Sequence, residues 1–239
     1  MRIKKDSWLL TKPIAHRGLW GDTVVENSLL AYKKATELGY PIEIDVFLTA
    51  DDVLISIHDR NLKRLTGIDA ITTDKTLKEL KELFILGSDQ KIPTLDEVLS
   101  LCEGKSPLLI EIKNQDRGNK CVEKLVERLK NYNGEFAIQS FNPFYINKIK
   151  KLAPEFIRGI LASKTPDTKS IIEKFVVKFM PFNFLIKPDF ISYEFTGLPL
   201  RKRKRKNKAL LSWTVTDQFT YDDIKPHVNN IIFENFIPR

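Results

Sequence analysis

Cysteine, glycine and long apolar runs are all scarce in this chain. Its 239 residues include two cysteines, Cys102 and Cys121, too few for a disulfide scaffold and consistent with a reducing compartment. Ten glycines and twelve prolines exclude a collagen-like or low-complexity chain. The longest uncharged stretch, 136–147, is shorter than the roughly 18 residues of a membrane-spanning helix. The N-terminal segment 1–13 lacks the apolar stretch of a signal peptide, so we expect a cytoplasmic protein.

The remaining composition is that of a globular protein with an excess of positive charge. Hydrophobic residues make up 42% of the chain, enough for one packed core, and the length suits one barrel or large α/β domain. We therefore expect a single domain over residues 1–239. Lysine and arginine outnumber aspartate and glutamate by 39 to 31. This balance favours phosphates, nucleic acids or acidic lipid surfaces as partners without choosing among them.

Short apolar runs alternate with helical patterns along the chain. The runs expected to form strands are 13–16, 42–47, 108–112, 136–140, 157–161, 189–193, 210–215 and 230–233. Helical patterns between them include 27–38, 95–102, 119–132 and 143–152. Eight strands alternating with helices predict an α/β fold of the (β/α)8 TIM-barrel type. A doubly wound open sheet is the alternative, although it usually has fewer strands in a chain of this length.

One extra strand interrupts the alternation. Residues 54–58 follow the second strand after a turn too short for a crossover helix, which predicts an antiparallel hairpin. If Asp51 and Asp52 are the two turn residues, His58 lies opposite Asp45. A polar insertion at about 60–92 follows, with a helical pattern at 77–83, and we expect it to form a cap or side lobe.

Titratable side chains gather at the ends of the expected strands, where barrel folds keep their active sites. They are His16 and Arg17 on the first strand, Glu43 and Asp45 on the second, His58 and Asp59 on the hairpin, and Glu111 and Lys113 on the third. The carboxylates of Glu43, Asp45 and Glu111 come from adjacent strands and would repel one another unless they share a hard divalent cation, Mg²⁺ or Ca²⁺. The neighbouring arginine and lysine suit a phosphate, and the two histidines titrate near neutrality and can move protons.

Short motifs occur in order over most of the length. They are Ala15–Gly18, Glu26–Ser28, Glu43–Val46 with Thr49–Asp51, His58–Asp59 with Leu62, Arg64 and Thr66–Gly67, Ile92–Leu99, Ile110–Lys113, Gln139–Phe141 and Trp213–Val215. This series resembles the glycerophosphodiester phosphodiesterases, which belong to the phosphatidylinositol-phospholipase-C-like barrels. The last strand departs from that family, because residues 230–235 read NIIFEN where many members have a Gly-Ile-Ile-Thr-Asp-like sequence.

The resemblance implies an activity and a role for each matching residue. The family hydrolyses glycerophosphodiesters to glycerol 3-phosphate and an alcohol, with a divalent cation as cofactor. By resemblance, the catalytic pair is His16 and His58, the metal ligands are Glu43, Asp45 and Glu111, the phosphate contacts are Arg17 and Lys113, and an apolar wall of the substrate pocket is Trp213. Asp59 either orients His58 or accepts hydrogen bonds from the backbone.

Two other functions stay open at this point. One is a lysophospholipase-D-like activity on lipid substrates; the other is a non-catalytic, anionic-surface-binding barrel that works through the basic run 201–206. The intact carboxylates and histidines favour the enzyme. We interpret the basic run as a solvated surface, with weak contact to an anionic membrane as the alternative, and we expect no nucleic-acid partner because no aromatic residue interleaves with it. The apolar segment 175–186 is expected to pack on the barrel, with a membrane-surface edge as the alternative.

Overall fold

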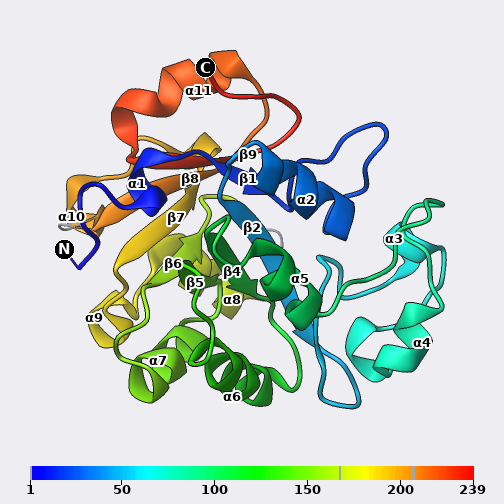
Figure 1. Ribbon diagram of the computed structural model, residues 1–239. Helices are drawn as coiled ribbons and strands as arrows, with labels where there is room; N and C mark the ends of the chain where they lie inside the picture. The colour runs from blue at the N-terminus through cyan, green and yellow to red at the C-terminus, as the bar shows by residue number, and fades with distance from the viewer. Residues whose placement is uncertain (1, 167, 206–207) are drawn as a thin grey trace. The chain divides into compact units, whose positions relative to one another are not determined.

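The fold is a TIM barrel, as the alternation of strands and helices predicts. The structure, a computed structural model, describes residues 2–166, 168–205 and 208–239 (Figure 1). Parallel strands of the described chain close the barrel in the order β1-β9-β8-β7-β6-β5-β4-β2, with β1 pairing back to β2. These strands are β1 (Ile14–His16), β2 (Ile42–Leu48), β4 (Leu108–Ile112), β5 (Phe136–Ser140), β6 (Arg158–Ala162), β7 (Phe190–Glu194), β8 (Ala209–Val215) and β9 (Asn230–Phe233).

Helices separate most of the strands. They are α1 (Trp8–Thr11), α2 (Leu29–Glu37), α3 (Lys63–Thr66), α4 (Leu77–Lys81), α5 (Leu95–Cys102), α6 (Gly118–Leu129), α7 (Pro143–Leu152), α8 (Ile171–Phe179), α9 (Asn183–Ile186), α10 (Lys202–Arg205) and α11 (Gln218–Ile224). Their starting points follow from the sequence. Ser28 accepts a hydrogen bond from the backbone of Ala31, and Thr94 and Glu97 form a reciprocal capping box at α5. Among the described residues, no helix is both long and apolar enough to cross a membrane.

The chain divides into two compact units. Residues 15–136 form one, and the segment that ends at Ile14 together with 137–239 forms the other. In the second unit, Asn230 explains the departure in the last strand. Its side-chain amide donates to the carbonyl oxygens of Leu9 (3.0 Å) and Lys12 (2.7 Å), and so ties the end of α1 to β9. A glycine at this position has no side chain to make these bonds.

The hairpin is present, but its register differs by one residue from the prediction. Strand β3 (Leu54–Ser56) pairs antiparallel with β2, with Val46 opposite Ser56 and Leu48 opposite Leu54. Three residues, 50–52, therefore form the loop, and Asp52 adopts the left-handed conformation with φ of 67°. Ile57, not His58, lies opposite Asp45, and its backbone N–H donates to the Asp45 carbonyl at 3.2 Å. The prediction of a two-residue turn was wrong.

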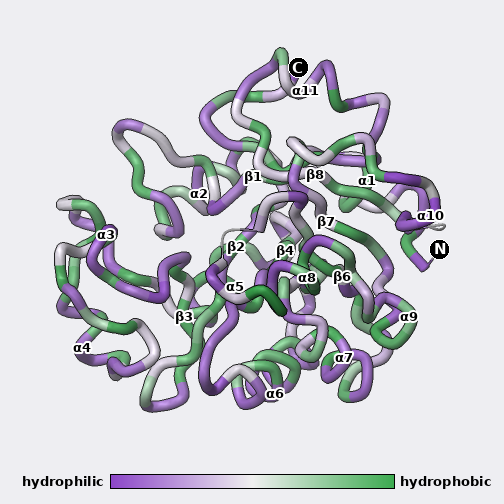
Figure 2. Tube along the Cα trace, turned by 180° about the vertical axis from the view of Figure 1, so that it is seen from behind, coloured by the Kyte–Doolittle hydropathy of each residue, from purple (hydrophilic) through white to green (hydrophobic). Residues whose placement is uncertain are grey.

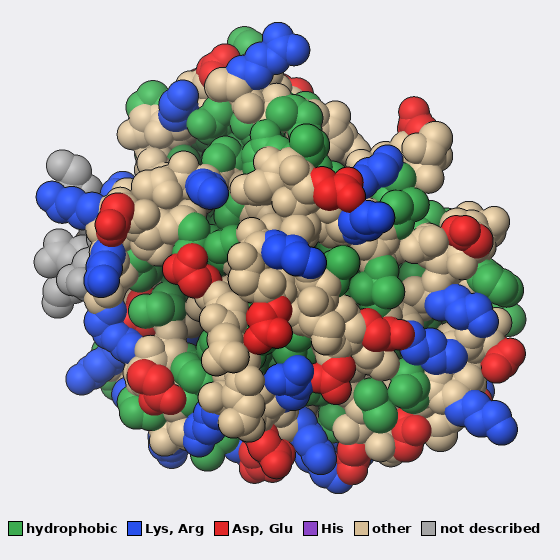
Figure 3. All heavy atoms as spheres, viewed as in Figure 1, with side chains coloured by type: hydrophobic (Ala, Val, Ile, Leu, Met, Phe, Trp, Pro, Cys, Tyr) green, Lys and Arg blue, Asp and Glu red, His purple; other side chains and the backbone are tan. Residues whose placement is uncertain are grey.

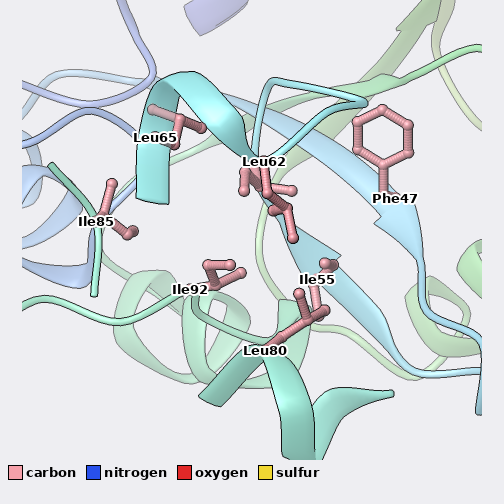
Figure 4. Close-up of a cluster of buried hydrophobic side chains, with 8 residues drawn as sticks. Phe47, Ile55, Leu62, Leu65, Leu80, Ile85 and Ile92 are labelled. Carbon is pink, nitrogen blue, oxygen red and sulfur yellow. The ribbon is translucent and has the colours of Figure 1, made fainter. Parts of the chain in front are cut away.

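The insertion packs onto this hairpin through a small apolar core of its own. Figure 4 shows Leu62, Leu65, Leu80, Ile85 and Ile92 of the insertion lying around Ile55 of β3. All of these side chains are buried. Helices α3 and α4 lie next to each other in the ribbon of Figure 1 and in the Cα tube of Figure 2, which is seen from behind. The expected side lobe is thus held by burial of its apolar face, which is the main stabilising term available to so short a segment.

Candidate active site

Strand pairing alone brings the three predicted carboxylates together in the unit formed by 15–136. In the parallel pair β2–β4, Asp45 lies opposite Glu111, and in the pair β1–β2, Glu43 lies opposite His16. Glu43 and Asp45 are two residues apart on β2, so their side chains point to the same face. Each of the three residues places a carboxylate oxygen within 4.8 Å of the others, and all three residues are buried.

The charges in this cluster perturb one another strongly. Burial raises the pKa of Glu43, and the negative charges of Asp45 and Glu111 raise it further. Burial also opposes ionisation of Asp45, but the positive charge of Lys113, followed by those of His58 and Arg17, lowers the pKa of Asp45 overall. One carboxyl of the cluster therefore resists ionisation while its neighbour stays ionised.

Lys113 lies at the centre of these charges. Its Nζ is 2.9 Å from Oε1 of Glu111 and 3.3 Å from Oδ1 of Asp45. Burial alone would lower the pKa of Lys113, but the negative charges of Glu111 and Asp45 outweigh it, so the pKa of Lys113 is raised. The ammonium therefore stays charged beside the carboxylates, as a group that binds phosphate must.

A tight turn after β1 places His16 and Arg17 against the carboxylates. Arg17 is left-handed (φ 58°), and its backbone N–H donates to Oε2 of Glu43 at 3.2 Å. The guanidinium of Arg17 donates to Oε1 of Glu26 at 2.8 Å and lies 3.5 Å from Oδ2 of Asp45. Nε2 of His16 is 4.0 Å from Oε2 of Glu43. The turn thus directs both a backbone donor and two side chains toward the cluster.

His58 lies near enough to the cluster, despite the shifted register, for its charge to lower the pKa of Asp45. Its Nδ1 is 2.7 Å from Oδ1 of Asp59. Burial would raise the pKa of Asp59, but hydrogen bonds from His58 and Arg64 lower it, so Asp59 is ionised and accepts a hydrogen bond from the N–H at Nδ1. Nε2 is then the nitrogen left to exchange a proton. Of the two roles open to Asp59 in the sequence, orienting His58 is the one its side chain has here.

The sequence motifs contain three residues whose role the pattern did not reveal. The guanidinium of Arg64 donates through Nε to Oδ2 of Asp59 and through Nη2 to Oε1 of Glu26, both at 2.7 Å. Asn27 donates from Nδ2 to Oδ2 of Asp45 at 3.0 Å, and the hydroxyl of Tyr32 donates to Oδ1 of Asn27 at 2.7 Å. The membership of Glu26, Asn27 and Arg64 in the ordered motifs was the available signal, but their spacing does not predict these contacts.

Trp213 belongs to the other compact unit. Its Nε1 donates to the carbonyl oxygen of Ser192 at 3.1 Å, and its ring meets Phe141 edge-on with centroids 5.6 Å apart. These contacts hold the indole in a defined orientation on β8. Its place in the wall of a substrate pocket stays a prediction. His227 is exposed, and Cys102 and Cys121 are buried.

The carboxylate cluster fits a hard divalent cation. All three donors are oxygens, which Mg²⁺ and Ca²⁺ prefer. Oδ1 of Asp45 is buried and accepts no hydrogen bond from the residues that the structure describes. Its partner is the ammonium of Lys113 at 3.3 Å, and a cation bound between the three carboxylates would add the ligand contact that a buried carboxylate oxygen favours. Glu43, Asp45 and Glu111 are therefore suited to hold a divalent ion.

Comparison with known proteins decides the family. The model of the glycerophosphoryl diester phosphodiesterase family matches residues 16–230. The chain belongs to this family. A glycerophosphodiester phosphodiesterase of Caldanaerobacter subterraneus is 34% identical over 94% of both chains. A lysophospholipase D of Homo sapiens is 32% identical over 55% of this chain and 45% of its own.

Solved structures agree with the glycerophosphodiester phosphodiesterase assignment. A phosphodiesterase from Oleispira antarctica, solved with the product sn-glycerol-3-phosphate, superposes with a TM-score of 0.81 at 24% identity, covering 94% of this chain and 93% of its own. A glycerophosphodiester phosphodiesterase from Thermotoga maritima superposes with a TM-score of 0.71 at 26% identity, covering 92% of both chains. The TIM-barrel fold and the assignment of the chain as a phosphodiesterase are thereby confirmed.

Proposed function

We propose that the chain hydrolyses glycerophosphodiesters to glycerol 3-phosphate and an alcohol, with a divalent cation held by Glu43, Asp45 and Glu111. The observation that carries this proposal is the convergence of these buried carboxylates within 4.8 Å of one another, beside the cations Arg17 and Lys113. Family membership supports the reaction class. The relative from Caldanaerobacter subterraneus, a glycerophosphodiester phosphodiesterase that matches almost the whole chain, supports the substrate class.

The phosphate is held by positive charge. A bound Mg²⁺ or Ca²⁺ supplies Lewis-acid polarisation of the phosphoryl oxygens. The guanidinium of Arg17 and the ammonium of Lys113, both next to Asp45, would bind the same phosphate and stabilise the charge that builds up on its oxygens. Glu26 keeps the guanidinium of Arg17 in place through its 2.8 Å hydrogen bond. The buried position of these groups strengthens their interaction with an anion.

The two histidines move the protons. One imidazole accepts the proton of the attacking hydroxyl as its oxygen bonds to phosphorus, and the other donates a proton to the alcohol oxygen as the P–O bond to it breaks. The attacking oxygen belongs either to water or to a neighbouring hydroxyl of the substrate. If the substrate hydroxyl attacks, a cyclic phosphate forms first. The ionised Asp59 beside Nδ1 stabilises the protonated form of His58.

Release of glycerol 3-phosphate tests the proposal. Purified protein is incubated with glycerophosphocholine or glycerophosphoethanolamine, with Mg²⁺, Ca²⁺ or a chelator. We expect release that chelation abolishes and that one of the cations restores. His16→Ala and His58→Ala should each lower turnover about 10²- to 10⁴-fold. His227→Ala is the matched control, because His227 is exposed and should leave turnover unchanged. Turnover that survives thorough chelation, or an unaffected His16→Ala variant, contradicts the mechanism.

A second candidate activity is the hydrolysis of lysophospholipids. It is favoured by the relative named lysophospholipase D, although the match covers little more than half of this chain. The same catalytic groups would serve both substrates, because the scissile phosphodiester is the same. Parallel assays with lysophosphatidylcholine and glycerophosphocholine separate the two. A higher kcat/KM for glycerophosphocholine supports the first activity, and a higher value for the lysolipid supports the second.

A further inference from the structure

Helix α8 exposes an apolar face to solvent. The segment 175–186 was expected to pack on the barrel, and that prediction was wrong for Phe175, Phe179 and Phe184, although Met180 and Ile186 are buried. The exposed fractions are 82% for Ile171, 77% for Ile172, 54% for Phe175 and 48% for Phe179. None of the nine residues of α8, all of which the structure describes, is buried. So short a helix has little intrinsic stability and normally buries its apolar side.

The exposed residues form one stripe along the helix. At 3.6 residues per turn, Ile171, Ile172, Phe175 and Phe179 fall within an arc of about 100°. Val176 and Val177 lie outside this arc and are half-buried, and the buried Met180 follows at the end of the helix. The helix is therefore anchored by one side while the stripe faces solvent.

Positive charge borders the apolar stripe. Lys174 and Lys178 lie on α8 at its edge and are exposed. Lys204 of α10 joins them, since its Nζ donates to the carbonyl oxygen of Lys178 at 3.1 Å and lies 5.2 Å from the centre of the Phe179 ring. Burial and the neighbouring charges of Arg201 and Lys178 lower the pKa of Lys204, as expected where cations are crowded. Of the basic run 201–206, Lys206 and the side chain of Lys202 lie outside the described residues.

We propose that the α8 face, defined as the stripe of Ile171, Ile172, Phe175 and Phe179 with its bordering lysines, docks on the surface of an anionic phospholipid bilayer. Apolar side chains of an interfacial helix enter the boundary between headgroups and acyl chains, and lysines at its edge reach the lipid phosphates. The charge of this face complements that surface. A second copy of the chain fits less well, because a two-fold contact would bring like-charged lysines together.

Sedimentation with vesicles tests the proposal on the full-length chain. The probes are vesicles of phosphatidylcholine alone and of an equimolar mixture of phosphatidylcholine and phosphatidylglycerol. We expect partitioning into the mixed vesicles to be at least about tenfold stronger, since each lysine near the surface contributes to binding. Added NaCl should weaken it. The assay does not depend on catalysis, so its outcome is separate from that of the proposed hydrolysis.

Matched variants locate the binding surface. Ile172→Ser/Phe175→Ser should lower partitioning about tenfold or more, and Lys174→Gln/Lys178→Gln should remove the preference for anionic vesicles. Phe219→Ser is the control, because Phe219 is 85% exposed but lies on α11, away from the stripe in sequence. Circular dichroism and Tm verify folding. Equal partitioning of all variants, no binding by the unaltered chain, or a dimer in sedimentation velocity that Phe175→Ser dissociates would overturn the proposal.

Discussion

Arg64 links two parts of the candidate active site through a single guanidinium. One edge of its fork binds Asp59, the partner of His58, and the other binds Glu26, the partner of Arg17. These bonds raise the pKa of Arg64, so its charge is permanent. Because a planar fork fixes both carboxylates at once, the positions of His58 and of Arg17 depend on the same side chain.

Arg64→Lys should lower kcat about tenfold or more, because a lysine keeps the charge but has no fork to span Asp59 and Glu26. Steady-state kinetics on glycerophosphocholine measure the effect, and the pH profile of kcat should change, since Asp59 no longer holds His58 in the same way. Arg60→Lys is the matched control, as Arg60 pairs with the exposed Asp116 in a surface ion pair of small value. Equal kcat for the two variants would argue against a positioning role.

The sequence predicts the three carboxylates of this site but not the residues that hold the catalytic side chains in place. Glu43, Asp45 and Glu111 follow from local rules, since alternate strand residues share a face and parallel strands end at one edge. The contact between Glu26 and Arg64 joins residues 38 apart, through loops whose conformation depends on the packing around them. The position of His58 rested on a turn type, and one additional loop residue changed the register.

Gly18 joins the turn after β1 to helix α2. It has φ of +84°, and a Cβ placed on it would lie 2.7 Å from the carbonyl carbon of Ala31. The backbone of Leu19 donates to the carbonyl oxygen of Ala31 at 3.0 Å. The close approach of turn and helix thus requires a residue without a side chain, and it determines where Arg17 can lie.

Gly18→Ala should therefore cost stability twice, through left-handed strain of about 1–2 kcal/mol and through overpacking of about 1–3 kcal/mol. Urea unfolding followed by circular dichroism measures the loss. Gly39→Ala is the control, because Gly39 has φ of +72° but open space around it, so it should lose only the strain term. A loss for Gly18→Ala no larger than that for Gly39→Ala would show that α2 yields to the added methyl group.

Elements differ in how well their surroundings can be predicted. The run 42–47 predicts a strand, and every residue of β2 is buried, including Glu43 and Asp45 of the carboxylate cluster. The apolar pattern of α8 predicts a helix, yet periodicity gives only the side on which apolar residues gather, not whether another element covers it. Burial of 175–186 was inferred from hydrophobicity alone; Met180 and Ile186 are buried, but the exposure of Phe175 and Phe179 corrects the prediction for the helix.

The whole molecule combines a net charge of +8 with a buried acidic centre. On the face shown in Figure 3, basic and acidic side chains are interspersed, so opposite charges offset one another locally. In the carboxylate cluster, Lys113 and Arg17 offset the negative charge only in part, because burial and the charges of Asp45 and Glu111 still raise the pKa of Glu43. Folding without a cation therefore carries an electrostatic cost that depends on pH, and binding of a cation should remove it.

The thermal stabilisation by Mg²⁺ or Ca²⁺ should grow as pH rises from about 5 to about 8. The pKa of Glu43 is raised in the folded protein, so the folded state holds a proton on Glu43 more tightly than the unfolded state does. The resulting contribution to stability is present at low pH and is lost as pH rises through the raised pKa. The pKa of Asp45 is lowered, so its favourable contribution is lost only in acid, below this range. Tm scans with cation or chelator should differ by about 3 °C or more at the upper pH and less at the lower.

Glu43→Gln provides the comparison for this experiment. An uncharged amide removes the repulsion with Asp45 and Glu111, so the variant without cation should be at least as stable as the unaltered chain near pH 8. It should also lose most of the stabilisation by cation, because one ligand is gone. A stabilisation that is independent of pH in the unaltered chain, or intact in Glu43→Gln, would place the cation elsewhere.

The burial of both thiols makes the chain suitable for site-specific labelling. Burial raises the pKa of Cys102 to about 11 and that of Cys121 to about 12, so at neutral pH neither presents a thiolate to reagents in solvent. A cysteine introduced at an exposed position would react with maleimides or spin labels, while the two native thiols would remain unmodified. Fluorescent or paramagnetic reporters can thus be attached without first replacing native residues.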